Sequence, residues 1–455
     1  MSNKKFSRRD FLKAAAAGAA IAPTLSIPGL RAFGAPAAQD VVNLRMMAWG
    51  SPLEKANIET GLAAFMAENP SITVEYIHTP DRYDEILQTM IAGDTAPDVF
   101  KVGNPYPDLA VRNALMDITD RVKSDPVLGA PDYFFPFEEE RSSLDGKWYG
   151  IGSTFQWRLI YYNKSMLETA GIEAPSTDPS KAWTWDKFLE VTTALTLDSA
   201  GKHPGEDGFD PEDVHQWGLF GDDTMYDNFI FSNGGTIIDP DTHLYMLDQP
   251  AAYDGIQAYA DLRLANHVAG QSAVLTQMGM SSWQMLASGR VAMIMDGNWA
   301  LQDIAKMGFE FGVGVLPEIM QPATVASSSR TSIYSKTVHP DEAWQLFRYL
   351  NMDEYQSGLI KVGLWGVSHQ TLLTPDGVKG WLTPGVHPDN WLPLETEYKL
   401  NFGHVVPNVV GMTKTATMIT QALADVWTGA RTAKDVFTEL NPALNQTLAD
   451  EKARV

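Results

Sequence analysis

The sequence predicts an α/β protein built from more than one lobe, with parallel strands at the start of its first sheet. Apolar residues switch between two-residue and helical spacing along the chain, which favours strands and helices in alternation. The chain has 455 residues, 44% of them hydrophobic, and single cores seldom grow past about 250 to 300 residues. It has no cysteine, so a large apolar core rather than disulfides must stabilise the fold.

The first elements follow one another as strand, helix, strand, helix, strand. Residues 42–46 alternate apolar and polar side chains, as residues 72–76 do, and both segments are predicted strands. Residues 58–66 and 83–91 carry apolar side chains at helical spacing. Residues 98–100 begin the third strand. This order is typical of a parallel α/β sheet, whose ligands bind beyond the carboxyl ends of its strands.

Later segments are assigned by composition and spacing. Extended runs at 148–152 and 311–317 are expected to cross between lobes, and 198–213, rich in glycine, proline and acid, is expected to be a surface insertion. Apolar residues at helical spacing predict helices over 419–427 and 440–448.

The amino terminus has the sequence pattern of an export signal. Residues 7–13 read Ser-Arg-Arg-Asp-Phe-Leu-Lys, an apolar run follows at 14–25, and small residues lie at 35–37. We therefore expect a signal peptide over residues 1–37 that is recognised by the twin-arginine translocase. The alternative is a chance Arg-Arg pair in a basic tail. Without a cysteine for lipid attachment, and without a later run of roughly 20 apolar residues, the mature protein is expected to be soluble in the periplasm.

The charge of the chain limits its partners. Cleavage after Ala37 removes six basic residues and one acidic residue, so the formal net charge falls from −22 to −27. Such an acidic protein repels nucleic acid and anionic lipid. We expect a monomer without nucleic-acid partners, although a local positive site remains compatible with this charge.

Several segments in a fixed order carry a family resemblance. They are Trp49-Gly50, 96–99 (Ala-Pro-Asp-Val), 146–150 (Gly-Lys-Trp-Tyr-Gly), 161–164 (Tyr-Tyr-Asn-Lys), 183–188 (Trp-Thr-Trp-Asp-Lys-Phe), 232–235 (Ser-Asn-Gly-Gly), 289–293 (Gly-Arg-Val-Ala-Met) and 296–300 (Asp-Gly-Asn-Trp-Ala). In this order the chain resembles the extracellular solute-binding proteins of ABC sugar importers, the family that includes maltose-binding proteins.

The resemblance implies a two-lobed periplasmic-binding-protein fold of type II, in which each lobe is an α/β sheet with helices on both faces. It implies that residues 38–150 and 311–350 form the first lobe. Residues 151–310 and 351–455 would form the second lobe with the C-terminal helices. A carbohydrate or sugar derivative would bind in the interlobe cleft, close the lobes, and be delivered to the membrane permease.

The candidate ligand-binding residues come from two sources. Trp49, Ser51 and Asn104 follow the predicted ends of the first and third strands. The resemblance adds segments that line the cleft or approach it, namely Gln156, Trp157, Arg158, Asp222, Asp223, Trp299 and Trp365. Indole rings lie against the apolar faces of sugars, and planar polar groups bind their hydroxyls.

Some of these residues have structural alternatives. Trp49 and Trp157 are also suited to filling a core. Asp222 and Asp223 also fit a solvated acidic turn. Trp299 favours the site, because glycine and asparagine before it indicate an exposed turn.

Arg158 departs from the family pattern, in which this crossing carries proline and small residues. An arginine in a cleft suits a carboxylate or phosphate, so an anionic sugar derivative or glycerol phosphate is one expectation. The alternative is that Arg158 pairs with Asp222, Asp223 or another acid and stabilises the lobe.

The rival class is an exported glycoside-active enzyme. A glycosidase needs only two suitably spaced carboxylates, and a chain with 56 acidic residues offers many candidates. However, no thiolate zinc site, nucleophile elbow or phosphate-binding loop is present in the sequence. We therefore expect no catalytic residues and no cofactor. Calcium binding by residues 207–213 is a further alternative, although the spacing does not match an EF-hand loop.

Overall fold

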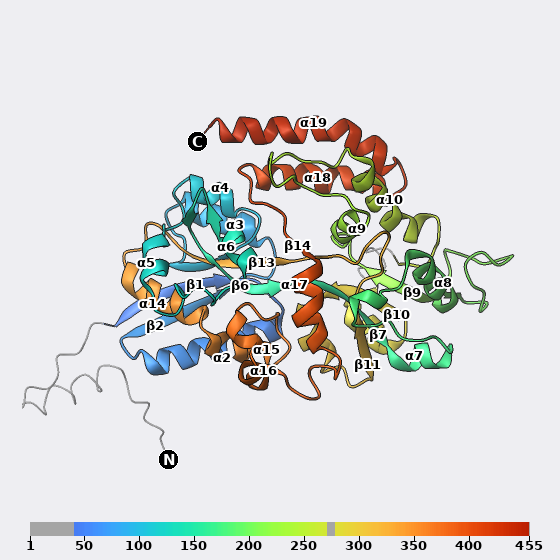
Figure 1. Ribbon diagram of the computed structural model, residues 1–455, viewed down its shortest axis with the longest axis horizontal. Helices are drawn as coiled ribbons and strands as arrows, with labels where there is room; N and C mark the ends of the chain where they lie inside the picture. The colour runs from blue at the N-terminus through green and yellow to red at the C-terminus, as the bar shows by residue number, and fades with distance from the viewer. Residues whose placement is uncertain (1–40, 271–277, 455) are drawn as a thin grey trace, which may run out of the picture. The chain divides into compact units, whose positions relative to one another are not determined.

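The computed structural model describes residues 41–270 and 278–454. Two five-stranded sheets organise them (Figure 1). In spatial order the first sheet consists of β2 (Ile72–His78), β1 (Val42–Ala48), β3 (Val99–Val102), β13 (Ser327–Ile333) and β6 (Ile151–Gln156). The second consists of β11 (Phe311–Gly314), β7 (Arg158–Asn163), β10 (Val291–Gly297), β9 (Val214–Gly221) and β8 (Leu197–Asp198). The predicted α/β class with more than one sheet is confirmed.

The predicted opening of the first sheet is also confirmed. β1 pairs in parallel with both β2 and β3, and the connections are the helices α2 (Pro52–Glu68) and α3 (Tyr83–Ala92). The buried face of α2 carries Ile58, Leu62 and Phe65 at the predicted helical spacing. These side chains pack with Leu44 of β1 in one apolar cluster, so the helix covers the sheet as the sequence indicates.

The chain changes sheets at short extended segments. β6 pairs antiparallel with β13 in the first sheet, and β7 pairs antiparallel with β10 in the second. Only Trp157 separates β6 from β7. After β11 the chain returns to the first sheet as β13, which pairs antiparallel with β3.

Two strands and one helix belong to, or pack with, a different sheet from the one expected. Residues 151–156 were assigned to the second lobe but form β6 of the first sheet. Residues 311–314 were assigned to the first lobe but form β11 of the second sheet. The helix α15 (Asp353–Ile360) was assigned to the second lobe, yet Tyr355 and Leu359 pack in the first sheet's cluster. Alternating apolar residues indicate a strand but do not specify which sheet it joins.

The C-terminal helices α18 (Met412–Trp427) and α19 (Ala433–Lys452) cover both predicted segments. They share an apolar cluster with α10 (Pro250–Leu264), beside the second sheet. The first turn of α18 is instead held by Asp108 on α4 (Tyr106–Val111), whose carboxylate accepts hydrogen bonds from the backbone N–H groups of Gly411 and Thr413. Figure 1 shows α18 and α19 running along the top, from the side of α4 towards that of α10.

The remaining elements are short connections and covering helices. The helices are α5 (Thr119–Ser124), α6 (Pro136–Ser142), α7 (Lys164–Thr169), α8 (Trp185–Leu195), α9 (Tyr226–Ser232), α12 (Ser282–Ser288), α13 (Leu301–Ile304), α14 (Pro340–Leu350), α16 (Pro375–Trp381) and α17 (Lys399–Phe402). Two strand pairs lie outside the main sheets, β4 (Ser143–Leu144) with β5 (Lys147–Trp148) and β12 (Thr324–Val325) with β14 (Gly403–His404). Among the described helices, none has both the length and the apolar character needed to span a bilayer.

Candidate functional site

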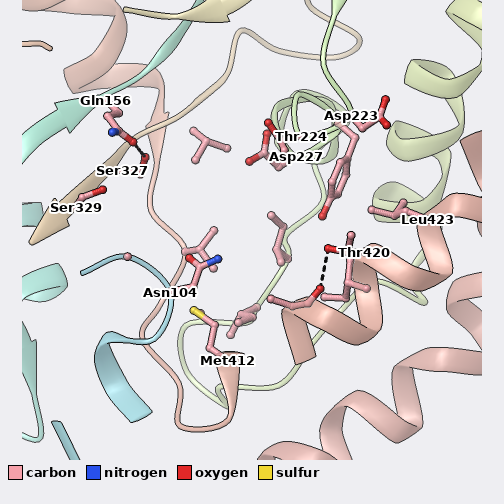
Figure 2. A pocket seen from close by; sticks show the side chains of 18 of the residues that line it. Asn104, Gln156, Asp223, Thr224, Asp227, Ser327, Ser329, Met412, Thr420 and Leu423 are labelled. Atoms are coloured by element: carbon pink, nitrogen blue, oxygen red, sulfur yellow. Dashed lines mark hydrogen bonds between the residues drawn. The ribbon is translucent and has the colours of Figure 1, made fainter. Parts of the chain in front are cut away.

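A cavity of about 600 Å³ is lined by residues from both sheets and from α18. Asn104 follows β3, and Gln156 is the last residue of β6. Figure 2 shows Gln156, Ser327 and Ser329 on one side, opposite Thr224 and Asp227, with α18 below the acidic residues. Strand ends of two sheets therefore face one cavity, where one ligand can contact both.

The wall formed by the first sheet is polar. Residues 327–330 of β13 read Ser-Ser-Ser-Arg, and all four line the cavity. Ser327 Oγ lies 3.5 Å from Gln156 Oε1 and accepts a hydrogen bond from Arg158 Nη1 at 3.0 Å. The guanidinium carbon of Arg158 is 5.2 Å from the centroid of a Trp299 ring, within the range of a cation–π contact. Arg158 is thus held in place by the Ser327 hydroxyl, by the Val325 carbonyl, which lies 3.4 Å from Nη1, and by the Trp299 ring.

Two further arginines lie in the same wall. Arg141 Nη2 donates to the Ser328 carbonyl at 3.0 Å, and Arg330 Nη2 donates to Asn408 Oδ1 at 2.7 Å. Both side chains are buried. Burial, reinforced by the positive charge of Arg330, lowers the pKa of Arg141 to about 9. The site therefore holds concentrated positive charge at a desolvated surface.

The acidic side of the cavity is formed by the loop before α9 and by α9 itself. Asp223 Oδ1 accepts a hydrogen bond from Arg263 Nη1 at 2.8 Å. Burial raises the pKa of Asp227 to about 6, against the opposing attraction of Arg158. Behind the wall, burial raises the pKa of Asp296 to about 7. These two carboxyl groups change charge near neutral pH.

The third wall, formed largely by α18, is mostly apolar. Met412, Ile419, Leu423 and Trp427 of this helix line the cavity, and Thr420 adds a hydroxyl. Thr420 Oγ1 donates to the Ala416 carbonyl at 2.9 Å within the helix. The cavity therefore presents charged and polar groups on two facing sides and a mostly apolar surface along α18.

Four of the residues predicted from the sequence line this cavity, namely Asn104, Gln156, Arg158 and Asp223. Trp49 lines a neighbouring hollow, which meets the cavity at Gly103, Asn104 and Ser329. Its ring packs edge-on against Tyr83 with centroids 4.7 Å apart. Trp49 thus lies next to the cavity rather than in its wall.

Trp157 lies in the core, contrary to its assignment to the site. It is 0% exposed and packs against Trp391, with centroids 5.3 Å apart. Side chains of consecutive residues in an extended segment point to opposite sides. Because Gln156 and Arg158 face the cavity, Trp157 between them points away from it.

Trp365 and Ser51 also have structural roles. Trp365 is buried in the first sheet's cluster, with Lys101 Nζ 3.5 Å from its ring centroid. Ser51 caps α2, because its Oγ accepts a hydrogen bond from the Glu54 N–H at 3.2 Å. Neither residue lines the cavity.

Asp222 and Trp299 lie close to the cavity without lining it. Asp222 Oδ1 accepts a hydrogen bond from the Thr224 N–H at 2.6 Å. This bond fixes an exposed turn, which agrees with the solvated acidic turn named as the alternative for Asp222. Trp299 is half-buried and packs against the apolar clusters of both sheets. It contacts the site through Arg158.

Several residues that line the cavity are not predicted from the sequence. Arg141 follows three glutamates on α6, a pattern that resembles a solvated helix surface. Asn408 precedes α18 in a segment without a motif. The polar run from Ser327 to Ser332 is a signal that could identify this wall of the cavity. A central strand that lacks alternating apolar residues is expected to face polar groups or a ligand.

The surface insertion is held by its own residues. Asp198 Oδ1 accepts hydrogen bonds from the N–H groups of Ala200 and Lys202, and Asp198 Oδ2 accepts one from Asp210. Within residues 41–270 and 278–454, no group of three or more His, Cys, Asp or Glu side chains has the arrangement of a metal site.

Comparison with known proteins adds an independent observation. A family model described as bacterial extracellular solute-binding protein matches residues 49–357, more than half of the chain. A putative binding protein of Brucella abortus (strain 2308) is 24% identical over 307 residues, which cover 65% of this chain and 68% of that protein. The maltotriose-binding protein of Pyrococcus abyssi (strain GE5 / Orsay) is 20% identical over 63% of this chain and 57% of its own length.

Solved structures share the fold. An ABC substrate-binding protein from Listeria monocytogenes in complex with cycloalternan superposes with a TM-score of 0.78 at 20% identity, over 90% of this chain and all of that one. A maltose-bound protein from T. maritima gives a TM-score of 0.72 at 19% identity, over 89% and 99% of the two chains. The expected two-lobed fold, with one sheet in each lobe, is thereby confirmed.

Proposed function

Because the chain belongs to the bacterial extracellular solute-binding protein family, we propose that it is the substrate-binding component of an ABC transporter for a carbohydrate or sugar derivative. The observation that carries this proposal is the cavity between the two sheets, with its amide, hydroxyl and charged side chains. A volume of about 600 Å³ is in the range of small-molecule sites. The relatives that bind maltotriose, maltose and cycloalternan support a carbohydrate as the ligand.

The polar groups suit a hydroxyl-rich molecule. Asn104 and Gln156 each offer an amide donor and acceptor, and Thr224 and Thr420 offer hydroxyl groups at the opposite walls. The apolar surface of α18 and Trp427 is suited to the CH faces of a sugar ring. We propose that each sheet forms the centre of one lobe. The chain crosses from the first lobe to the second at Trp157 and returns between β11 and β13.

Transport requires that the bound state differ from the free state. A ligand that contacts Gln156 on the first sheet and Asp227 on α9, which follows β9 of the second sheet, gains both sets of contacts only when the lobes are close together. It therefore favours the closed state by its difference in affinity for the two states. We propose that the membrane permease recognises this closed state and receives the solute.

The proposed location is the periplasm, as a soluble monomer without a lipid anchor. The twin-arginine motif in residues 1–37, a segment that lies outside the described residues, supports the export step of this proposal. Replacing Arg8 and Arg9 together with lysine is expected to retain the precursor in the cytoplasm. Cell fractionation with an antibody measures this, and unchanged periplasmic protein contradicts twin-arginine export.

We propose that the protein does not transform its ligand. Its support is membership of a family of binding proteins. Incubation of equimolar protein and ligand, followed by mass spectrometry of the recovered solute, is expected to return it unchanged. A cleaved or modified solute would instead establish the exported enzyme.

The direct test of the proposed function is a thermal-shift screen of the mature protein. The panel contains neutral mono- and oligosaccharides, uronates, polyols and glycerol phosphates. A ligand present at 100 times its dissociation constant stabilises the folded state by about 2.7 kcal/mol, so a true ligand raises the melting temperature by several degrees. If no carbohydrate or polyol derivative raises it, the proposed substrate class is wrong.

A further inference from the structure

From the contacts of Arg158, we infer that the solute is an acidic sugar derivative, whose anionic group, a carboxylate or a phosphate, binds to the Arg158 guanidinium group. This inference rests on the proposed function and narrows its substrate class. It depends on the charges that the protein leaves without a counterion at one wall of the cavity.

Arg158 has no carboxylate within 4 Å among the residues that the structure describes. Its Nη1 donates to the Ser327 hydroxyl at 3.0 Å and to the Val325 carbonyl at 3.4 Å, both neutral acceptors. Its Nε is buried and has no hydrogen-bond partner among these residues. A buried donor of a charged group that lacks a partner is costly, so a ligand that supplies an acceptor is stabilised here.

The acids named as alternative partners are engaged elsewhere. Asp223 forms its ion pair with Arg263 at 2.8 Å. Asp222 Oδ1 accepts hydrogen bonds from the N–H and hydroxyl of Thr224, both at 2.6 Å. Asp227 and Asp296 lie near enough to interact with Arg158 electrostatically, but neither forms an ion pair with it within 4 Å. The structural alternative for Arg158 is therefore wrong for Asp222 and Asp223.

The neighbouring arginines add positive charge to the same wall. Both Arg141 and Arg330 donate to neutral oxygens, among them the Ser328 and Arg141 carbonyls. The nearby buried acid is Glu138, whose oxygens accept hydrogen bonds from Ser142 Oγ, the Gly152 N–H and Ser328 Oγ at 2.7 to 2.9 Å. One carboxylate thus faces two buried guanidinium groups. This wall carries excess positive charge although the whole chain has a formal net charge of −22.

The geometry suits a sugar acid. A planar carboxylate binds an arginine through parallel N–H···O bonds, and Gln156 beside it can bind the adjacent ring hydroxyl groups. Asp227, on the opposite side of the cavity, repels a doubly charged group more than a singly charged one. Between the two anionic groups, these contacts favour the carboxylate.

The test uses the mature protein in isothermal titration calorimetry. The probes are galacturonate, glucuronate and digalacturonate, their neutral counterparts galactose, glucose and 4-O-α-D-galactopyranosyl-D-galactose, and the phosphates glucose 6-phosphate and glycerol 3-phosphate. We expect an acidic sugar to bind at least about 100-fold more tightly than its neutral counterpart. Tighter binding of the phosphates than of the uronates would assign the anionic group as phosphate instead of carboxylate.

Two comparisons isolate the charge. Arg158→Met is expected to weaken binding of the acidic ligand by at least about 100-fold. The control is Arg431→Met, which removes an arginine that is paired with Glu439 and does not line the cavity, and it is expected to leave the affinity unchanged. If Arg158→Met does not fold, the methyl ester of the acid is titrated against the natural protein. The ester lacks the charge, so it is expected to show the same loss.

The failures are distinguishable. A neutral sugar that binds as tightly as its acid, with equal affinity in the natural protein and in Arg158→Met, would overturn the anionic ligand and leave the proposed function standing. An absence of binding by every acidic, neutral and phosphorylated probe, monomer or oligomer, would overturn both.

Discussion

Cationic side chains in the core and at the cavity have different partners. In the core, Lys399 Nζ forms an ion pair with Glu395, with both side chains 0% exposed, and donates to the Val367 carbonyl at 2.6 Å. Lys101 Nζ, also buried, lies 3.2 Å from Glu54 Oε1. Arg158 at the cavity has neutral oxygens and an indole ring in place of a carboxylate.

This difference separates charges that serve the fold from charges that serve a ligand. Removing one member of a buried ion pair leaves the other charge desolvated and unpaired, so it destabilises the folded state strongly. Removing a cation that forms no ion pair breaks no such pair, so the expected loss of stability is smaller. The effect on stability and the effect on binding should therefore fall on different residues.

The largest expected effect is on the core pair. Lys399→Met leaves Glu395 charged and buried, and should reduce the free energy of unfolding by about 3–5 kcal/mol. Urea denaturation followed by circular dichroism measures it. The double variant with Glu395→Gln should recover most of the loss, because the orphaned charge is gone. A single-variant loss below about 1 kcal/mol would show that the pair contributes little.

A pH profile tests the acid behind Arg158. The pKa of Asp296 is raised from 3.8 to about 7 by burial, so the folded state holds a proton that the unfolded state has lost between these values. Its stabilising contribution is present below about pH 4 and is lost as pH rises to about 7, with a slope of at most about 1.4 kcal/mol per pH unit. The free energy of unfolding of Asp296→Asn should depend less on pH in this window than that of the natural protein, as measured by urea denaturation of each. Parallel profiles would contradict the raised pKa.

A smaller effect is expected at Asp108, a buried charge whose partners all belong to the protein. Asp108→Ala removes the cap of α18 and should reduce the free energy of unfolding by about 1–2 kcal/mol. Asp376→Ala, whose side chain is 93% exposed, is the matched control and should have almost no effect. Equal losses in the two variants would mean that the cap does not stabilise the helix.

The smallest expected effect on stability is that of Arg158→Met. In the absence of ligand it should change the free energy of unfolding by less than about 1 kcal/mol, because the loss of the hydrogen bonds to Ser327 and Val325 and of the contact with the Trp299 ring is offset by removal of a charged group whose buried Nε has no partner among the described residues. The methionine side chain still packs near Trp299. A loss as large as that of Lys399→Met would place Arg158 among the structural cations.

The sequence predicts the sheet elements better than the site. The two-residue and helical spacings of residues 42–100 are set by burial on one face, and each of those elements is present. Gln156 and Arg158 were found by resemblance. The sequence does not distinguish Trp157 from these two site residues, because an indole is suited to either a core or a binding site. Only the alternation of side chains along the extended segment excludes Trp157 from the cavity wall.

The rest of the cavity depends on long-range packing. Arg141 and Arg330 lie 189 residues apart, and their contact arises when α6 packs against β13. α18 was predicted as a helix, but its apolar residues are shared between a core cluster and the cavity. Periodicity identifies an apolar face and does not say which part of that face remains accessible.

The most direct measurement is a crystal structure of the protein with the acidic ligand identified by calorimetry. We expect ligand density in the cavity between the two sheets, with carboxylate or phosphate oxygens within about 3 Å of Arg158 nitrogens. A ligand bound outside this cavity, or a neutral hydroxyl group facing Arg158 while the acid points to solvent, would contradict it.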